Sequence, residues 1–217
     1  MLPARTLPPR HLVRVRALLR CDIDFVVALH REQFPDNAAS RLGRFFLRAY
    51  YASFVASPHA IAYAVECDGR IAGFLVGIVR TGEHRRRLLR RHLPWMLPAA
   101  VLGALLSPGH AFRLAKARLR RSDQRSTGPA GTAAYAVLSH IAVEDHRRGT
   151  GLGAALMDHF ETEAWNSGAT RLLLATTDDS GAGVFYERRG WRSTHQRQTF
   201  DGRSITLYAL DGNRCAP

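Results

Sequence analysis

Residues 141–153 read Ile-Ala-Val-Glu-Asp-His-Arg-Arg-Gly-Thr-Gly-Leu-Gly. An apolar run ends in a glycine-rich turn, and apolar residues at helical spacing follow, which predicts a strand, a tight turn and a helix. The first turn of a helix carries unpaired backbone N–H groups at the positive end of its dipole, where phosphate binds well. Glycines 149, 151 and 153 remove Cβ atoms that would obstruct a diphosphate. Arg147 and Arg148 add positive charge, so the stretch predicts a diphosphate site.

Two better-known glycine-rich phosphate loops do not fit this stretch. The nucleoside-triphosphate loop needs Gly-Lys-Ser or Gly-Lys-Thr, and the only lysine of the chain is Lys116. The dinucleotide fingerprint G-x-G-x-x-G fails because the glycines here alternate with other residues. Taken alone, the triplet leaves open a plain strand-to-helix turn whose glycines serve packing.

A second motif stands one expected helix and one expected strand further on. Residues 182–191 read Ala-Gly-Val-Phe-Tyr-Glu-Arg-Arg-Gly-Trp. Together with Arg148-x-x-Gly151-x-Gly153, this block resembles the signatures R/Q-x-x-G-x-G/A and A-x-x-x-Y-E-x-x-G-F of the GNAT superfamily of N-acyltransferases, with Trp191 in place of Phe. The resemblance covers residues 12–210 apart from one insertion. It implies an α/β (α+β) fold with a mixed, mostly antiparallel sheet of about seven strands flanked by helices.

Local patterns predict the same number of strands along the chain. Asp68-Gly69 and Asp201-Gly202 each stand between two β-rich runs, which indicates two hairpins. We expect Asp22 to cap the first helix and Ser40 to open the second. The expected strands are 12–17, 60–66, 71–79, 135–143, 171–176, 192–200 and 203–210, and later helices are expected at 151–166 and 181–189.

Residues 80–131 interrupt this pattern between the third and fourth strands. Basic runs flank an apolar stretch at residues 93–106, whose 14 residues fall short of the roughly 20 that span a bilayer. Pro94 and Pro98 break any undisturbed helix within it. We expect a single domain over residues 1–217, with 80–131 as a helical insertion that forms a lid on the acceptor side.

Composition narrows the class of protein. The chain has 217 residues, a size suited to one domain. Its net charge of +13 predicts a surface that attracts anions. The three cysteines, Cys21, Cys67 and Cys215, show neither a disulfide framework nor a metal-ligand spacing, and we expect no metal. The N-terminal residues lack a continuous apolar core, so we expect a cytoplasmic protein, with attachment to the inner membrane face left open.

The resemblance implies acetyl-CoA, or another acyl-CoA, as co-substrate. Its pantetheine arm would lie where the fourth strand splays from the fifth, and its pyrophosphate would lie on the glycine-rich loop. Asp179 occupies a position where many relatives carry an asparagine that contacts this arm, and a carboxylate can only accept hydrogen bonds. The coenzyme-binding residues implied are Ile141, Ala142, Val143, Arg148, Gly149, Thr150, Gly151, Leu152, Gly153 and Asp179.

The resemblance also suggests the catalytic groups. Tyr186 stands where the family commonly places the acid that protonates the departing thiolate. The alternative is a packing tyrosine whose hydroxyl only positions the sulfur. His140 has a suitable intrinsic pKa for a general base, and Asp178 and Asp179 follow the fifth strand, which itself has no acid. A water chain without a dedicated base stays open.

The acceptor is the least determined part of the prediction. Peptide-modifying relatives use an acidic residue on the fifth strand, and its absence at 171–176 favours the amine of a small molecule. A protein amine, or an amine on a carrier protein or lipid, remains an alternative, because the arginine-rich insertion suits an anionic carrier protein or membrane surface. The competing class is a non-catalytic basic module that binds nucleic acid or membrane. We expect no nucleic acid partner, and a homodimer stays open.

Overall fold

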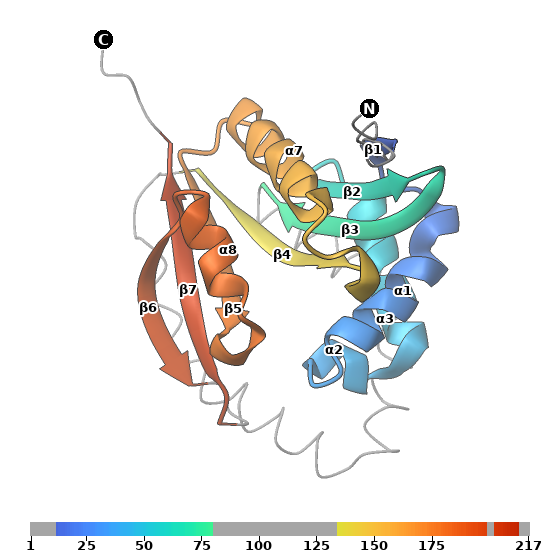
Figure 1. Ribbon diagram of the computed structural model, residues 1–217, viewed down its shortest axis with the longest axis horizontal. Coiled ribbons are helices and arrows are strands. Elements are labelled where there is room, and N and C mark those ends of the chain that lie inside the picture. Colours follow the sequence, from blue (N-terminus) through green and yellow to red (C-terminus); the bar gives the residue numbers. More distant parts are fainter. Residues whose placement is uncertain (1–11, 80–133, 199–201, 213–217) are drawn as a thin grey trace, which may run out of the picture.

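The computed structural model describes residues 12–79, 134–198 and 202–212 (Figure 1). The expected insertion at 80–131 and Cys215 lie outside the described residues. Cys21 and Cys67 are both free thiols. None of the helices within the described ranges is both long enough and apolar enough to cross a membrane.

A sheet of seven strands forms the centre of the molecule, in the order β1-β2-β3-β4-β5-β7-β6. Neighbouring strands are antiparallel except β4 and β5, which run parallel. This confirms the predicted mixed, mostly antiparallel sheet. The strands are β1 (Val13–Ala17), β2 (Ala60–Cys67), β3 (Arg70–Ile78), β4 (Tyr135–Val143), β5 (Arg171–Thr177), β6 (Arg192–Gln198) and β7 (Ser204–Asp211).

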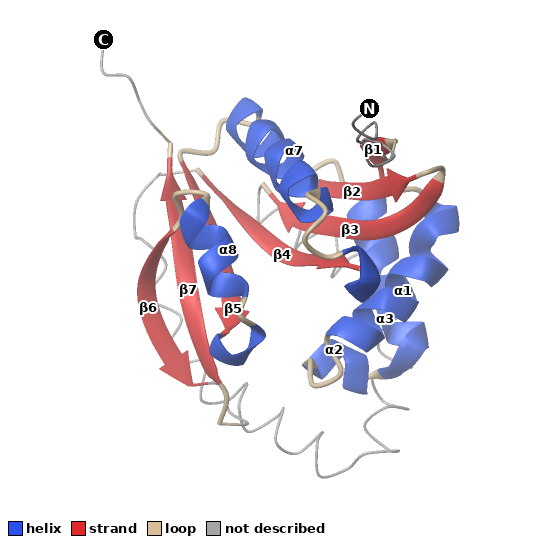
Figure 2. Ribbon diagram, viewed as in Figure 1, coloured by secondary structure: helices blue, strands red, loops and turns tan. Residues whose placement is uncertain are grey.

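Helices cover both faces of the sheet (Figures 1 and 2). On one face, α7 (Leu152–Asn166) and α8 (Ala182–Arg188) bury a core that includes Leu156, Phe160 and Tyr186. On the other face, α1 (Ile23–Gln33) and α3 (Gly43–Val55) bury a second core. The short helix α2 (Ala38–Arg41) connects them.

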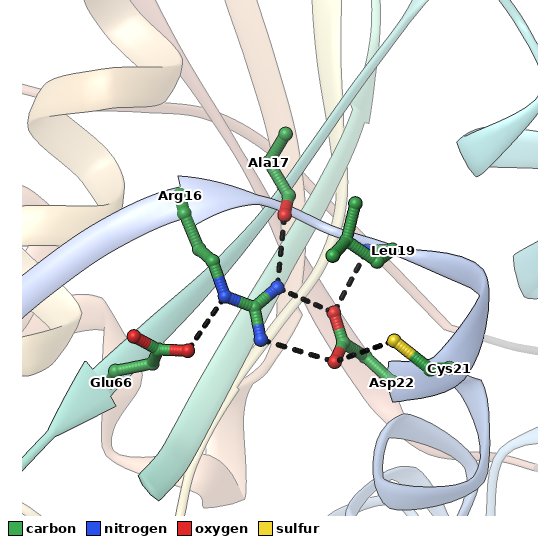
Figure 3. A network of polar contacts seen from close by, with 6 residues as sticks. All are labelled: Arg16, Ala17, Leu19, Cys21, Asp22 and Glu66. Carbon is green, nitrogen blue, oxygen red and sulfur yellow. Dashed lines mark hydrogen bonds and ion pairs between the residues drawn. The ribbon is translucent and has the colours of Figure 1, made fainter. Parts of the chain in front are cut away.

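Asp22 stands at the N-cap position of α1, as expected, but the expected side-chain cap is absent. Its side chain makes no capping bond to α1; it closes a turn by accepting the Leu19 N–H (2.8 Å) and pairs with Arg16 (2.6 Å). Arg16 also reaches Glu66 of β2 at 2.6 Å, so the network of Figure 3 fixes β1, β2 and the start of α1 together. Burial acts to raise the pKa of Asp22, but bonds from Arg16 and Leu19 outweigh it and lower the pKa.

The second helix is also broken where one continuous helix was expected. Asn37 opens α2 by accepting the Ala39 N–H at 2.9 Å, three residues earlier than predicted. Ser40 instead donates its hydroxyl to the Phe34 carbonyl oxygen at 2.6 Å. The chain then restarts as α3 at Gly43. These bonds hold the end of α1 against α2.

Two irregularities of β4 shape the middle of the sheet. Its register with β3 passes from Val76↔His140 to Gly77↔Leu138, so Ser139 is an extra, bulged residue. Its parallel pairing with β5 covers only residues 135–137 against 171–173. Beyond these pairs the two strands diverge, as Figure 1 shows. The divergence implied by the resemblance is therefore present, and it opens the interior of the sheet.

Candidate active site

A cavity of about 690 Å³ occupies the place where β4 and β5 part. One wall is β4 from Leu138 to Val143 and another is the end of β5 with the start of α8. The turn before α7 closes one end, and residues from the end of α1 close another. Residues from four separate regions line it: Gln33, Phe34 and Asn37; Leu138–Val143; Arg147, Arg148, Gly149, Gly151, Gly153 and Ala154; and Leu174–Thr177, Ser180–Ala182, Phe185 and Tyr186.

The glycine-rich turn has the backbone that its sequence requires. Gly149 and Gly151 have φ of 77° and 89°, in the left-handed region that L side chains rarely adopt. A Cβ atom on either glycine would meet no protein atom within 4 Å, so conformation and not crowding within the protein demands glycine there. The turn delivers the first N–H groups of the 15-residue helix α7 to the cavity rim. Such a turn can hold a diphosphate.

Arg148, Asp145 and Gln33 form a hydrogen-bonded triad that links the glycine-rich turn to the end of α1. The Arg148 guanidinium donates to the Gln33 Oε1 at the end of α1. It also pairs with Asp145 at 2.8 Å, and the Gln33 amide donates to the same carboxylate at 2.9 Å. Arg148 therefore stays at the cavity rim and remains largely exposed. An exposed guanidinium beside a helix N-terminus suits an anionic ligand.

Tyr186 lies on α8 with its side chain turned into the molecule. It is only 5% exposed, and its ring packs against Phe185, Trp191 and Tyr208. Burial raises the pKa of Tyr186 to about 12. Among the described residues none hydrogen-bonds to its hydroxyl, so a protonated donor borders the cavity across the physiological pH range.

His140 faces the α1–α3 side of the sheet because the bulge at Ser139 precedes it. Its ring lies 4.9 Å from that of His30, 5.6 Å from Phe34 and 5.8 Å from Tyr50. Burial, together with the neighbouring His30, lowers the pKa of His140 to about 3. The imidazole is therefore neutral at physiological pH.

The end of β5 contributes hydroxyl groups. Thr176 and Ser180 line the cavity and lie 3.0 Å apart through their side-chain oxygens. Asp178 does not line it; hydrogen bonds from Ser204 and Thr206 lower the pKa of its carboxyl group. Asp179 lies in a turn, but its side chain lies outside the described residues. Within residues 12–79, 134–198 and 202–212, no group of three His, Cys, Asp or Glu side chains could hold a metal ion.

Most residues suggested by the sequence meet at this cavity. Those that line it are His140, Ile141, Ala142, Val143, Arg148, Gly149, Gly151, Gly153 and Tyr186. Two others do not: the Thr150 hydroxyl donates to the Arg147 carbonyl oxygen at 2.7 Å, and Leu152 is buried in the core. Gln33, Phe34 and Asn37 also line the cavity, and they were not among the predicted site residues. No local pattern marks them, since they reach the site only through the tertiary fold.

Comparisons with known proteins agree with this geometry. Residues 116–211 match the family model described as an acetyltransferase (GNAT) domain. No curated protein matches the chain. Solved structures share the fold at low sequence identity. The ribosomal-protein-S18-alanine N-acetyltransferase of Escherichia coli has 17% identity and a TM-score of 0.54, covering 95% of this chain and 100% of its own.

Two further structures extend the comparison across distant organisms. An N-acetyltransferase from Staphylococcus aureus Mu50 has 14% identity and a TM-score of 0.57, covering 92% of this chain and 98% of its own. NAA60 from Arabidopsis thaliana, solved in complex with acetyl-CoA, has 13% identity and a TM-score of 0.59, covering 93% and 99%. At these identities the likeness shows the fold.

The family match and the fold converge with the two sequence motifs. The glycine-rich turn opens α7 beside the diverging strands, and the Tyr186 block forms α8 across the same cavity. Residues 116–211 therefore match a GNAT acetyltransferase domain, and acetyl-CoA is the co-substrate of enzymes with that domain.

Proposed function

We propose that this enzyme transfers the acetyl group of acetyl-CoA to the amine of a small molecule, by direct attack in a ternary complex. The observation that carries the proposal is the continuous cavity of about 690 Å³ that extends from the glycine-rich turn to the residues at the end of α1 and the start of α2. Its size lies within the range of about 300–1,000 Å³ typical of small-molecule sites. Phe34 and Asn37 line the end of the cavity at which the acceptor amine would bind.

On the donor side of the cavity, both backbone and side-chain groups would bind the coenzyme. The N–H groups at the start of α7, with Arg148, would hold the pyrophosphate. Backbone groups of Ile141 and Val143 would hold the pantetheine arm, since β4 has no strand partner on that side beyond Val137. Both expectations come from the family resemblance, and the open edge of β4 supports the second.

Tyr186 would donate its hydroxyl hydrogen toward the departing sulfur. With a pKa of about 12, it is a weaker acid than a thiol, whose pKa is about 8.5. Complete proton transfer to a free thiolate would be unfavourable by roughly 5 kcal/mol. We therefore assign Tyr186 the role of a hydrogen-bond donor that stabilises negative charge on sulfur as the C–S bond breaks, with the proton arriving finally from solvent.

Water would accept the proton of the amine. A neutral His140 with a pKa of about 3 cannot take a proton from an alkylammonium group, whose pKa is about 10. Asp178 is held in hydrogen bonds away from the cavity. The amine would enter in its neutral form and lose its proton to solvent after attack.

A panel of acceptors tests the proposal. Release of free coenzyme A thiol and the mass of the product would be measured with acetyl-CoA and an arylamine, an aminoglycoside, a polyamine and a short peptide with a free N-terminus. We expect turnover with at least one small amine and none with the peptide. Turnover of the peptide alone would overturn the small-molecule assignment. A longer-chain acyl-CoA, run in parallel, reports the donor preference.

A further inference from the structure

Both partners of Arg148 contact the same one of its three side-chain nitrogens. Nη2 donates to Oε1 of Gln33 and lies 2.8 Å from a carboxylate oxygen of Asp145. Among the described residues, neither Nε nor Nη1 of this guanidinium has a partner. A guanidinium carries five N–H groups in a fixed plane, and Nη2 supplies two of them. The other N–H groups of Arg148 are therefore left for a ligand at the cavity rim.

Gln33 suits both of its neighbours because its amide carries an acceptor and a donor. Its Oε1 accepts from Arg148, and its Nε2 donates to Asp145 at 2.9 Å. A glutamate at position 33 would lack the donor for Asp145, and a leucine would lack the acceptor as well. The three side chains thus form a closed ring of contacts.

This ring joins a helix to the sheet. Gln33 is the last residue of the 11-residue helix α1. Asp145 begins the turn after β4, and the Glu144 N–H before it donates to the Ala72 carbonyl oxygen of β3 at 2.9 Å. Gln33 and Asp145 are 112 positions apart in the sequence. Arg148 is therefore anchored to two elements that the fold brings together.

The ion pair between Arg148 and Asp145 would not fix the guanidinium by itself. The two side chains are 62% and 64% exposed, and exposed pairs contribute little because water and salt compete for both charges. The bond to Gln33 adds an anchor on a second element and so restricts rotation of the arginine side chain. A side chain that is ordered before binding loses less entropy when its ligand arrives.

We propose that Gln33 and Asp145 are positioning residues that hold Arg148 at the cavity rim, with its remaining N–H groups available to the diphosphate of acetyl-CoA. The inference rests on the proposed placement of that diphosphate at the glycine-rich turn. A carboxylate near a diphosphate also repels it. The charge of Asp145 therefore opposes binding, while its oxygen anchors Arg148, and substitutions can separate these two effects.

A substitution at Gln33 tests the anchor. Calorimetric titration of Gln33→Leu should show roughly three- to tenfold weaker binding of acetyl-CoA and of ADP, which both carry a diphosphate. S-acetylpantetheine lacks the diphosphate, and ligand-detected NMR should show equal binding to the variant and the parent. Unchanged or tighter binding of acetyl-CoA, or equal weakening of all three ligands, would overturn the anchoring role.

Gln196→Leu is the matched control for this substitution. Gln196 is exposed on β6 and does not line the cavity. The control should bind all three ligands as the parent does. A loss of acetyl-CoA affinity in Gln196→Leu equal to that in Gln33→Leu would contradict the inference.

Two substitutions at Asp145 separate geometry from charge. Asn keeps an oxygen that accepts from both neighbours and removes the negative charge, so Asp145→Asn should bind acetyl-CoA at least as tightly as the parent. Leu removes the charge and the acceptor together, so Asp145→Leu should bind roughly three- to tenfold less tightly than Asp145→Asn. Equal affinities of these two variants would exclude a positioning role for Asp145.

Arg148→Met separates the inference from the placement of the coenzyme. If Gln33 acts through Arg148, Gln33→Leu should weaken acetyl-CoA binding in the parent and have no further effect in Arg148→Met. Additive losses in the double variant would overturn the positioning role and leave the placement of the diphosphate intact. Parental affinity in Arg148→Met itself would contradict that placement, and the inference with it.

Discussion

Gly151 and Gly168 stand at opposite ends of α7 and share one backbone requirement. Their φ values are 89° and 83°, and a Cβ atom at either would meet nothing within 4 Å. An alanine at either site is strained by about 1–2 kcal/mol. Only Gly151 belongs to the turn at the cavity rim. We predict that Gly151→Ala weakens acetyl-CoA binding at least tenfold, because relieving the strain redirects the N–H groups of the turn.

Gly168→Ala is the matched control for this prediction. Both variants should lose about 1 kcal/mol of unfolding free energy in urea denaturation. Calorimetric titration with acetyl-CoA should then distinguish them. Equal affinities in the two variants would remove the turn from the proposed binding site.

Tyr186 and Tyr208 offer a comparison of two neighbouring hydroxyl groups. Their rings lie 6.0 Å apart, but Tyr208 donates to Glu187 at 3.2 Å and does not line the cavity. We predict that Tyr186→Phe lowers kcat by roughly 10²–10³-fold with little change in acetyl-CoA affinity, because it removes one hydrogen-bond donor to the developing negative charge. Tyr208→Phe should retain the parental kcat. A Tyr186→Phe enzyme with full kcat would leave the ring a packing role only.

At the scale of elements, the sequence predicted the features that local patterns determine and missed those that depend on tertiary contacts. The strand expected at 135–143 coincides with β4, because alternation and flanking turns are local signals. Asp22 was misassigned because its sequence position suits a cap, whereas the fold brings Arg16 to it. The Gln33 side chain accepts a hydrogen bond from Arg148, beside the glycine-rich turn, although 115 positions separate the two residues. No periodicity in the sequence predicts a contact over such a distance. The sequence therefore predicted the site residues that belong to the two motifs, but not the wall formed by Gln33, Phe34 and Asn37.

For the whole molecule, His30 couples folding to pH. Its pKa of about 4 in the folded protein lies below the value of about 6.5 expected when the chain is unfolded. Between these pH values the unfolded chain binds more protons, so stability falls as the pH drops from 6.5 toward 4. We predict a loss of roughly 3 kcal/mol from this group. His30→Gln should lack that component in urea titrations at successive pH values.

Exposed His159 provides the control for this prediction. His159→Gln should keep the parental dependence of stability on pH, and His140 remains in every protein compared. If His30→Gln and the parent lose equal stability between pH 6.5 and 4, His30 is not the group responsible.

The bulge at Ser139 reverses which residues of β4 face each side of the sheet. Under strict alternation, Ala136, Leu138, His140 and Ala142 would share one side of the strand. The first two do pack under α7, but Ala142 packs with the α1–α3 core and His140 contacts its rings. Because of this one additional residue, the even-numbered residues after Ser139 face the side of the sheet that odd-numbered residues would otherwise face. Without it, Ile141 would take the place of His140 opposite His30, and an aliphatic side chain would face the His30 imidazole.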